Sequence, residues 1–216
     1  MQSLLKHAII ALALAAVPLA GRAQSTMRQL WAEMPDTLLP YLNRNLRQEC
    51  LDFVDMGVKA DVDNLVGGKT VMDTLTADYT RVTLSSAAEL EMRLLPTGDT
   101  TRIVCVVKIL RAPEPESSVA FFNTAWQRLD GDFGLSDMSL SKFLHRPDTM
   151  SQERYDEIVS WIDPVMTSAT LGMSEPVITF ALSFPLTTKD ERLQLCTVAR
   201  ERRWLWTGER FVEQER

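Results

Sequence analysis

The chain has 216 residues, 45% of them hydrophobic, and a formal net charge of −6 at pH 7. This length fits one larger domain or two small packed ones, and it suffices to bury a core without disulfides. An acidic chain whose densest basic stretch is residues 200–203 makes a poor nucleic-acid binder, so we expect no nucleic-acid partner.

The first 23 residues have the three-part pattern of a secretory signal peptide. Lys6 precedes an apolar run over residues 8–20 that is too short for a comfortable membrane span. The small residues Gly21 and Ala23 predict cleavage between Ala23 and Gln24. No cysteine stands directly after this cut, and no later stretch is apolar enough to span a membrane. We therefore expect an exported chain, periplasmic or secreted, with no lipid anchor and no mature transmembrane segment.

Two segments near the start of the expected exported chain have the residue patterns of helices. Residues 25–33 predict a short helix that Ser25 caps and Pro35 ends. A longer helix is predicted over residues 38–56, where apolar side chains recur every three or four residues and Gly57 supplies the stop. The polar residues of this segment, Asn43, Arg44, Arg47 and Gln48, fill the opposite face of the helix.

Short alternating segments then predict antiparallel strands at 70–75, 79–84, 89–94, 103–110 and 118–123. Glu89, Glu91 and Arg93 alternate with apolar residues, which is typical of a strand with one solvent-exposed face. A further helix is predicted over residues 150–163. Strands at 177–184 and 193–199 and a hairpin over residues 204–212 close the chain.

A helix followed by strands thus occurs twice, which predicts an α+β fold of antiparallel sheets with helices packed on one face. Residues 24–130 would form the first helix-plus-strands unit and residues 131–216 the second. The pattern fits two tandem helix-plus-four-strand units, in which Cys105 and Cys196 occupy comparable central strands, or one continuous domain. Cys50, Cys105 and Cys196 permit one disulfide in an oxidising compartment, or none.

Few residues carry a catalytic pattern. His145 is the sole histidine after the predicted cut, and residues 66–70 lack the glycine spacing of a phosphate-binding loop. Glu89 and Glu91 stand about 7 Å apart along one strand face, a separation that suits an acid/base pair. The solvated face of an antiparallel strand has the same appearance.

Two further patterns suggest binding. Asp130 and Asp132 place oxygen ligands at alternate positions, as calcium loops do, although Leu135 stands where such loops have glycine. An ordinary Asp/Gly turn explains the same residues. Trp204 and Trp206 point to one side of a strand and would make a stacking platform, with core packing as the alternative. No cofactor is expected.

Several short motifs of the chain also occur in a known protein family. They are Leu-Trp at 30–31, Met-Pro at 34–35, the helix start at 38–42, Asp-Met-Gly at 55–57, the turn at Ala112 and Pro113, Trp126 and the closing hairpin. They are similar to a family of uncharacterised exported proteins from Bacteroidales, over nearly the whole exported chain. The resemblance implies a domain of unknown function in a Gram-negative periplasm or at the cell surface. It brings no catalytic residues.

We therefore expect a non-catalytic binding or interaction module of the cell envelope, a link that rests on fold-level analogy. The first alternative is a glycan or lipid binder that uses the Trp204 and Trp206 face. The second is a carboxylate-dependent hydrolase. The near absence of histidine after the predicted cut argues against an enzyme.

Overall fold

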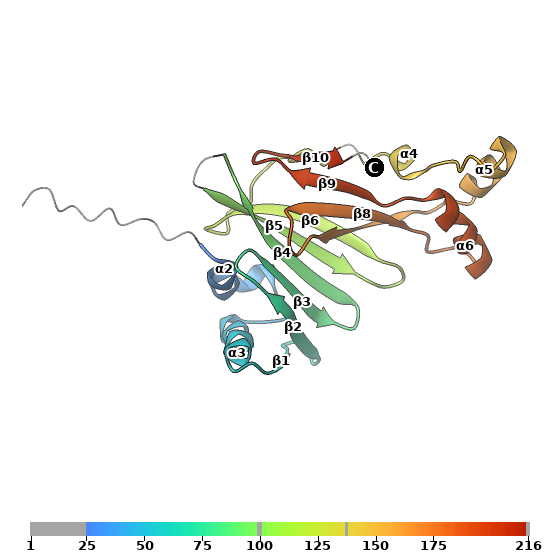
Figure 1. Cartoon of the computed structure of the whole chain (residues 1–216). Helices are drawn as coiled ribbons and strands as arrows, with labels where there is room; N and C mark the ends of the chain where they lie inside the picture. Colours follow the sequence, from blue (N-terminus) through green and yellow to red (C-terminus); the bar gives the residue numbers. More distant parts are fainter. Residues whose placement is uncertain (1–24, 99–100, 137, 215–216) are drawn as a thin grey trace, which may run out of the picture.

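The computed structural model describes residues 25–98, 101–136 and 138–214 of the chain. The predicted signal peptide and its cut between Ala23 and Gln24 lie outside these residues. The described chain forms three layers: a pair of helices, a six-stranded sheet and a four-stranded sheet (Figure 1). The prediction of an α+β fold with antiparallel sheets is confirmed. No helix in these ranges is long and apolar enough to cross a membrane.

The larger sheet is an antiparallel meander whose strands stand side by side in chain order. Each strand pairs with its neighbour in the sequence, so short turns join them. The strands are β1 (Ala60–Asp63), β2 (Lys69–Leu75), β3 (Tyr79–Ser85), β4 (Ala88–Pro96), β5 (Arg102–Leu110) and β6 (Glu116–Asn123).

Three short helical elements, α2 (Met27–Glu33), η1 (Asp36–Leu38) and α3 (Arg44–Asp55), cover one face of this sheet. Thr26 and Gln29 form a reciprocal capping box at the start of α2. The helices and the sheet share a core that includes Trp31, Cys50 and Met92, each less than 1% exposed. The amphipathic pattern of the sequence thus places this layer correctly.

The predicted helix over residues 38–56 is wrong at its start. Residues 39–42 form turns, and α3 begins at Arg44 because the Asn43 side chain accepts a hydrogen bond from the Leu46 amide at 3.0 Å. Leu39 and Leu42, which created the early periodicity, are buried in the core from the turn instead.

Arg47 is buried, although its position on the helix predicts a polar face; it is 1% exposed. Its Nε donates to the Trp31 carbonyl at 3.1 Å, and Nη1 donates to the Leu42 carbonyl at 2.8 Å and to Asp36 Oδ1 at 2.7 Å. Nη2 donates to the Met34 carbonyl. One guanidinium therefore supplies donors to carbonyls at the end of α2 and in the following turns, which would otherwise lack partners.

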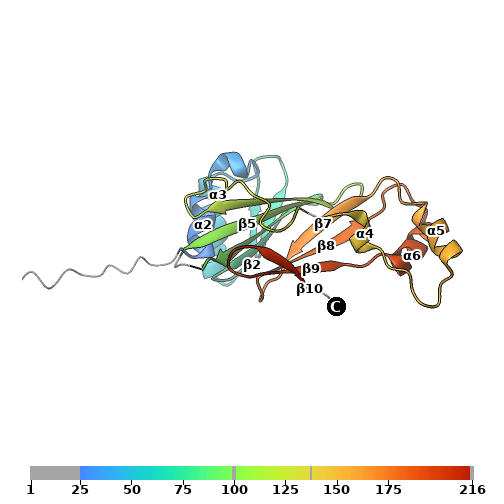
Figure 2. The same ribbon diagram turned by 90° about the horizontal axis from the view of Figure 1, so that it is seen from above.

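The smaller sheet has the order β10–β9–β8–β7 and packs on the other face of the larger one. Its strands are β7 (Met166–Leu171), β8 (Val177–Ser183), β9 (Arg202–Trp206) and β10 (Phe211–Gln214). Helix α4 (Leu140–Phe143) adds Phe143 to the core between the sheets. Helices α5 (Gln152–Val159) and α6 (Lys189–Val198) lie at the far end from α2 and α3 and share a small core of their own (Figures 1 and 2).

Four sequence-based expectations need correction. Residues 193–199, predicted as a strand, belong to helix α6, which begins at a capping box formed by Thr188 and Glu191. Cys196 is therefore helical and has no counterpart in Cys105 of β5. The predicted helix over 150–163 is shorter and begins after Ser151. Strands β1 and β7 were not predicted, because β1 has four residues and β7 carries no apolar alternation.

The three cysteines are free thiols in separate places. Cys50 is buried on the side of α3 that faces the larger sheet and Cys105 is buried between the sheets, whereas Cys196 is exposed on α6. Burial raises the pKa of the Cys50 thiol to about 12 and that of Cys105 further. Both buried thiols are therefore protonated and unreactive at neutral pH.

Candidate functional site

The predicted stacking platform lies inside the core between the sheets. Trp204 and Trp206 are 3% and 5% exposed, and Trp204 meets Phe180 edge-on with ring centres 5.2 Å apart. Trp206 Nε1 donates to the Pro96 carbonyl at 2.6 Å, which joins the smaller sheet to the larger. Both indoles serve as core residues here. Ligand binding at this face stays a prediction.

Asp130 and Asp132 lie in the loop between β6 and α4. Asp132 Oδ1 accepts a hydrogen bond from the Gly134 amide at 2.9 Å, and this bond lowers the pKa of the Asp132 carboxyl. Across the described residues, no three His, Cys, Asp or Glu side chains gather as metal ligands do. Asp137, in the same loop, is not among those residues. A calcium site at Asp130 and Asp132 therefore stays a prediction.

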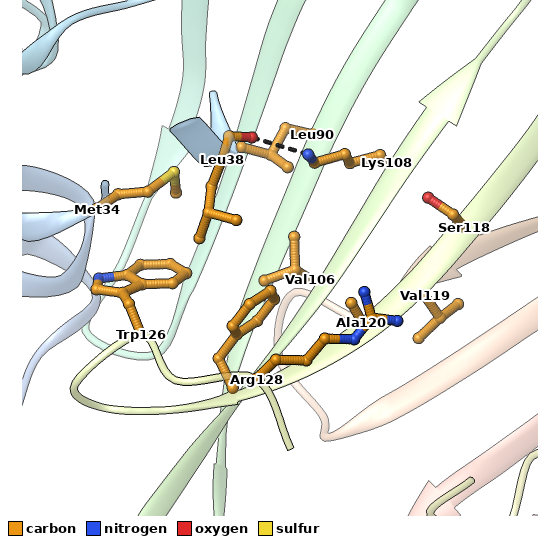
Figure 3. A pocket seen from close by; sticks show the side chains of 11 residues that line it. Met34, Leu38, Leu90, Val106, Lys108, Ser118, Val119, Ala120, Trp126 and Arg128 are labelled. Carbon is orange, nitrogen blue, oxygen red and sulfur yellow. Dashed lines mark hydrogen bonds between the residues drawn. The ribbon is translucent and has the colours of Figure 1, made fainter. Parts of the chain in front are cut away.

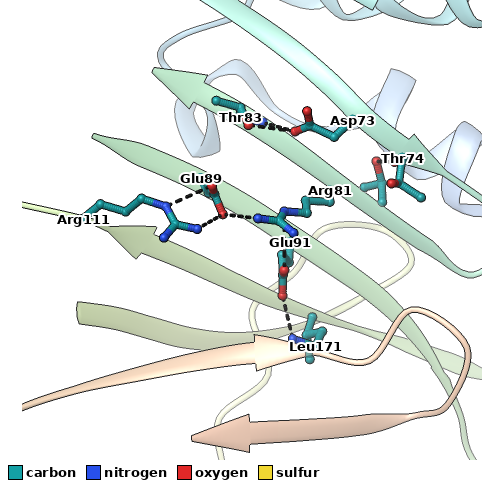
Figure 4. A network of polar contacts seen from close by, with 9 residues as sticks. Asp73, Thr74, Arg81, Thr83, Glu89, Glu91, Arg111 and Leu171 are labelled. Carbon is teal, nitrogen blue, oxygen red and sulfur yellow. Dashed lines mark hydrogen bonds and ion pairs between the residues drawn. The ribbon is translucent and has the colours of Figure 1, made fainter. Parts of the chain in front are cut away.

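Glu89 and Glu91 are buried and belong to an ion-pair network on the face of the larger sheet that meets the smaller one, not to a solvated strand face (Figure 4). The side chains of the two arginines in this network, Arg81 and Arg111, are 43% and 41% exposed. Glu89 accepts hydrogen bonds from Arg81 Nη2 at 3.1 Å and from Arg111 Nε at 2.9 Å. Burial alone would raise the pKa of the Glu89 carboxyl, but the two guanidinium groups outweigh it, and the pKa is lowered.

Glu91 has a different environment two residues along the same strand. Its Oε2 accepts a hydrogen bond from the Leu171 amide at 2.6 Å, and Arg81 Nε lies 3.9 Å from its Oε1. Burial raises the pKa of the Glu91 carboxyl, and the Leu171 amide and Arg81 offset this only in part. Both carboxylates are thus engaged by groups of their own chain. Hydrolysis by this pair stays a prediction.

The same face of β4 and β6 holds the β7–β8 hairpin in place. Glu91 accepts from the Leu171 amide, and Ser117 Oγ accepts from the Ala169 amide at 2.6 Å, so the larger sheet satisfies the free edge of β7. Arg93 donates to three carbonyls of the following turn, at residues 172–174. These polar residues therefore join the two sheets.

A pocket of about 180 Å³ opens on the helix-covered face of the larger sheet, where η1 ends and β5 and β6 emerge (Figure 3). We call it the β6 pocket. Lys108 Nζ crosses its rim to donate to the Leu38 carbonyl at 2.8 Å, and Ser118 and Arg128 stand on the β6 side. The remaining lining residues are apolar: Met34, Leu38, Leu90, Val106, Val119, Ala120, Phe122 and Trp126.

Trp126 forms one wall of the β6 pocket from an unusual backbone conformation. Its φ of 61° lies in the left-handed region, which bulky residues rarely adopt. The Asn123 side chain holds this turn by accepting hydrogen bonds from the Ala125 and Gln127 amides, both at 3.0 Å. The indole packs on Phe122 with ring centres 5.6 Å apart, and Nε1 is buried without a partner in the described part of the chain.

The charged residues of this pocket are two cations, Lys108 and Arg128. The Arg128 side chain is exposed, and no hydrogen bond or ion pair joins it to another of the described side chains. Arg128 also borders a neighbouring hollow of about 240 Å³ across β6, which Asp132 lines as well. An apolar floor with a positive rim can hold an apolar group that carries a negative charge nearby.

Sequence reasoning missed this pocket. The segment 104–108 predicts a buried central strand, and nothing in it shows that the helical layer stops before Lys108. Asn123 offered a faint signal of the turn at Trp126, because an Asn side chain often accepts a hydrogen bond from the backbone two residues on. Whether such a turn borders a pocket depends on residues from η1 and β4, far away in the sequence.

Fold and site together define an α+β protein of two stacked antiparallel sheets, with a helical layer that leaves part of one sheet face open. Residues 20–211 match the family model DUF3256, described as a protein of unknown function, and the chain belongs to this family. The family expected from the sequence resemblance, a domain of unknown function, is thus confirmed at this level.

A solved structure shows the same fold. The chain is similar to a domain of an uncharacterised protein from Porphyromonas gingivalis W83, with a TM-score of 0.72 and 19% sequence identity. The likeness covers 89% of this chain and all of the other. A search of the curated proteins finds no match.

Proposed function

We propose that this chain is an exported, non-catalytic binding module of the cell envelope, and that the β6 pocket is the surface that meets its partner. The observation that supports the pocket's role is its open, apolar floor beside half-exposed strand residues. Ala120 of β6 is partly exposed there, whereas Val104 and Val106 of β5, on the same face, are buried in the core that the helices share with this sheet. Open apolar concavities of this kind are typical of interaction sites.

The candidate catalytic carboxylates support a binding role rather than chemistry at this pocket. Glu89 and Glu91 point to the opposite face of the sheet, toward the smaller sheet, and bond to groups that hold the fold together. The titratable residues of the β6 pocket are a lysine and an arginine, which are poor general bases while charged.

A capture experiment tests the pocket. The purified chain from Gln24 is immobilised and exposed to envelope extract, beside the variants Ala120→Leu and Ala181→Leu. Ala120→Leu fills the pocket, while Ala181→Leu makes the same change at a half-buried position on β8 of the other sheet. We expect a protein retained by the wild type and by Ala181→Leu to be lost with Ala120→Leu. Equal capture by all three chains would refute the pocket as the binding surface.

Export is tested separately by expressing the full chain in a Gram-negative host. Mass spectrometry of the periplasmic fraction should find a chain that begins at Gln24. Replacing the small residue at the predicted cut, Ala23→Arg, should leave the precursor uncleaved. A full-length chain that stays in the cytoplasm would contradict the export part of the proposal.

A further inference from the structure

We propose that the partner presents one large apolar side chain, flanked by carboxylates, to the β6 pocket: the apolar group enters between Leu38 and Trp126, and the carboxylates meet Lys108 and Arg128. This inference rests on the proposed function and deepens it, because it states the chemistry of the partner. Size, charge and the rigidity of the pocket wall each support it.

The size of the pocket fits a single side chain. About 180 Å³ is smaller than the roughly 300–1,000 Å³ of pockets that enclose a drug-sized ligand. An engineered protein cavity of about 150 Å³ holds benzene. The β6 pocket therefore has room for one aromatic ring or one branched aliphatic group. A protein partner supplies such a group as an anchor residue, the kind of contact that carries much of the energy of an interface.

The positive charge of the pocket favours negatively charged residues on either side of that anchor. Lys108 and Arg128 are both positive, in a chain whose formal net charge is −6. Lys108 uses one donor on the Leu38 carbonyl, and two others remain. The guanidinium of Arg128 reaches along β6 beside Ala120 (Figure 3). Acidic residues on either side of an apolar anchor would complement both cations.

The wall of the pocket is held rigidly before any partner arrives. A left-handed conformation at a bulky residue is unfavourable by itself and persists when its surroundings enforce it. Asn123 enforces it at Trp126 through two amide hydrogen bonds. A preformed wall lowers the entropy that binding would cost. The buried indole N–H of Trp126 is also a local reporter of occupancy.

Three synthetic nonapeptides test the inference: one with a central phenylalanine among glutamates, one with that phenylalanine among lysines, and one with alanine among glutamates. The readout is the Trp126 indole N–H signal in a ¹⁵N-correlated NMR spectrum, assigned with Trp126→Phe, and followed to millimolar peptide. We expect the acidic phenylalanine peptide to shift this signal, with an affinity that falls as salt is added. The alanine peptide should bind at least about thirtyfold more weakly.

Charge variants complete the test. Arg128→Gln should weaken the acidic phenylalanine peptide about two- to fivefold, since the cation is exposed, and Lys108→Gln with Arg128→Gln about tenfold. Arg200→Gln removes an exposed arginine between α6 and β9, outside the pocket, and should change nothing. No shift with any peptide, or equal binding of the lysine peptide, would overturn the acidic-anchor proposal. Loss of envelope capture in Ala120→Leu would still support the pocket itself, so the two failures are distinguishable.

Discussion

Replacing Arg47 by methionine should lower the free energy of unfolding by about 4 kcal/mol. The guanidinium makes four hydrogen bonds, and at 1% exposure no water can take its place. Methionine replaces most of the apolar stem of Arg47, so the substitution mainly removes the hydrogen bonds to the carbonyls of Trp31, Met34 and Leu42. At about 1 kcal/mol for each bond, the sum is about 4 kcal/mol, similar to the cost of breaking a buried ion pair.

Urea unfolding of the chain from Gln24, followed by tryptophan fluorescence, measures this loss. With a slope of about 2 kcal/mol/M, the midpoint should fall by about 2 M at an unchanged slope. Arg28→Met is the matched control, because Arg28 lies on the neighbouring helix, is exposed and pairs with the exposed Asp55. The control should stay within about 1 kcal/mol of the wild type. A loss below about 1 kcal/mol for Arg47→Met would refute the reasoning.

Three further predictions concern the junction of the sheets and the thiols. Because the pKa of the Glu91 carboxyl is raised in the folded chain, the native state keeps a proton that the unfolded state loses above pH 4.5. The free energy of unfolding should therefore fall as pH rises from there. Unfolding measured at several pH values should show this fall in the wild type and not in Glu91→Gln. Arg93→Met should speed amide exchange at residues 172–176 at least about tenfold, with β3 unchanged, by hydrogen-exchange mass spectrometry. A thiol reagent should modify one cysteine of the native chain rapidly, and none after Cys196→Ser; a second fast thiol would contradict the burial of Cys50 and Cys105.

Local patterns predicted most of the elements, because helix caps and alternation act over a few residues. Residues 25–33 and the meander from 70 to 123 follow their patterns closely. The strand predicted at 193–199 failed because its apolar residues fit either period. The capping pair Thr188 and Glu191 stands five and two residues before this segment; it favours a helix, and helix α6 begins there.

The burial of charged residues could not be predicted from the same patterns. The sequence pattern predicts that Arg47 and Arg93 face solvent. Both are buried in the structure, where each guanidinium donates hydrogen bonds to backbone carbonyls of another segment. Glu91 likewise meets the Leu171 amide, 80 residues away. The β6 pocket is missed for the same reason. Its walls combine residues of η1, β4 and the turn at Trp126, and periodicity carries no information about such distant neighbours.

The contacts of Glu91 and Arg93 also bear on the order in which the chain folds. The larger sheet pairs only sequence neighbours, so it can form as the chain emerges. Docking of the β7–β8 hairpin instead closes a loop of 79–81 residues, which costs more chain entropy. Until Leu171 packs against the larger sheet, the apolar face that includes Val107 and Phe121 is exposed to solvent. A chain that emerges N-terminus first would therefore expose this apolar face until the residues of β7 and β8 follow.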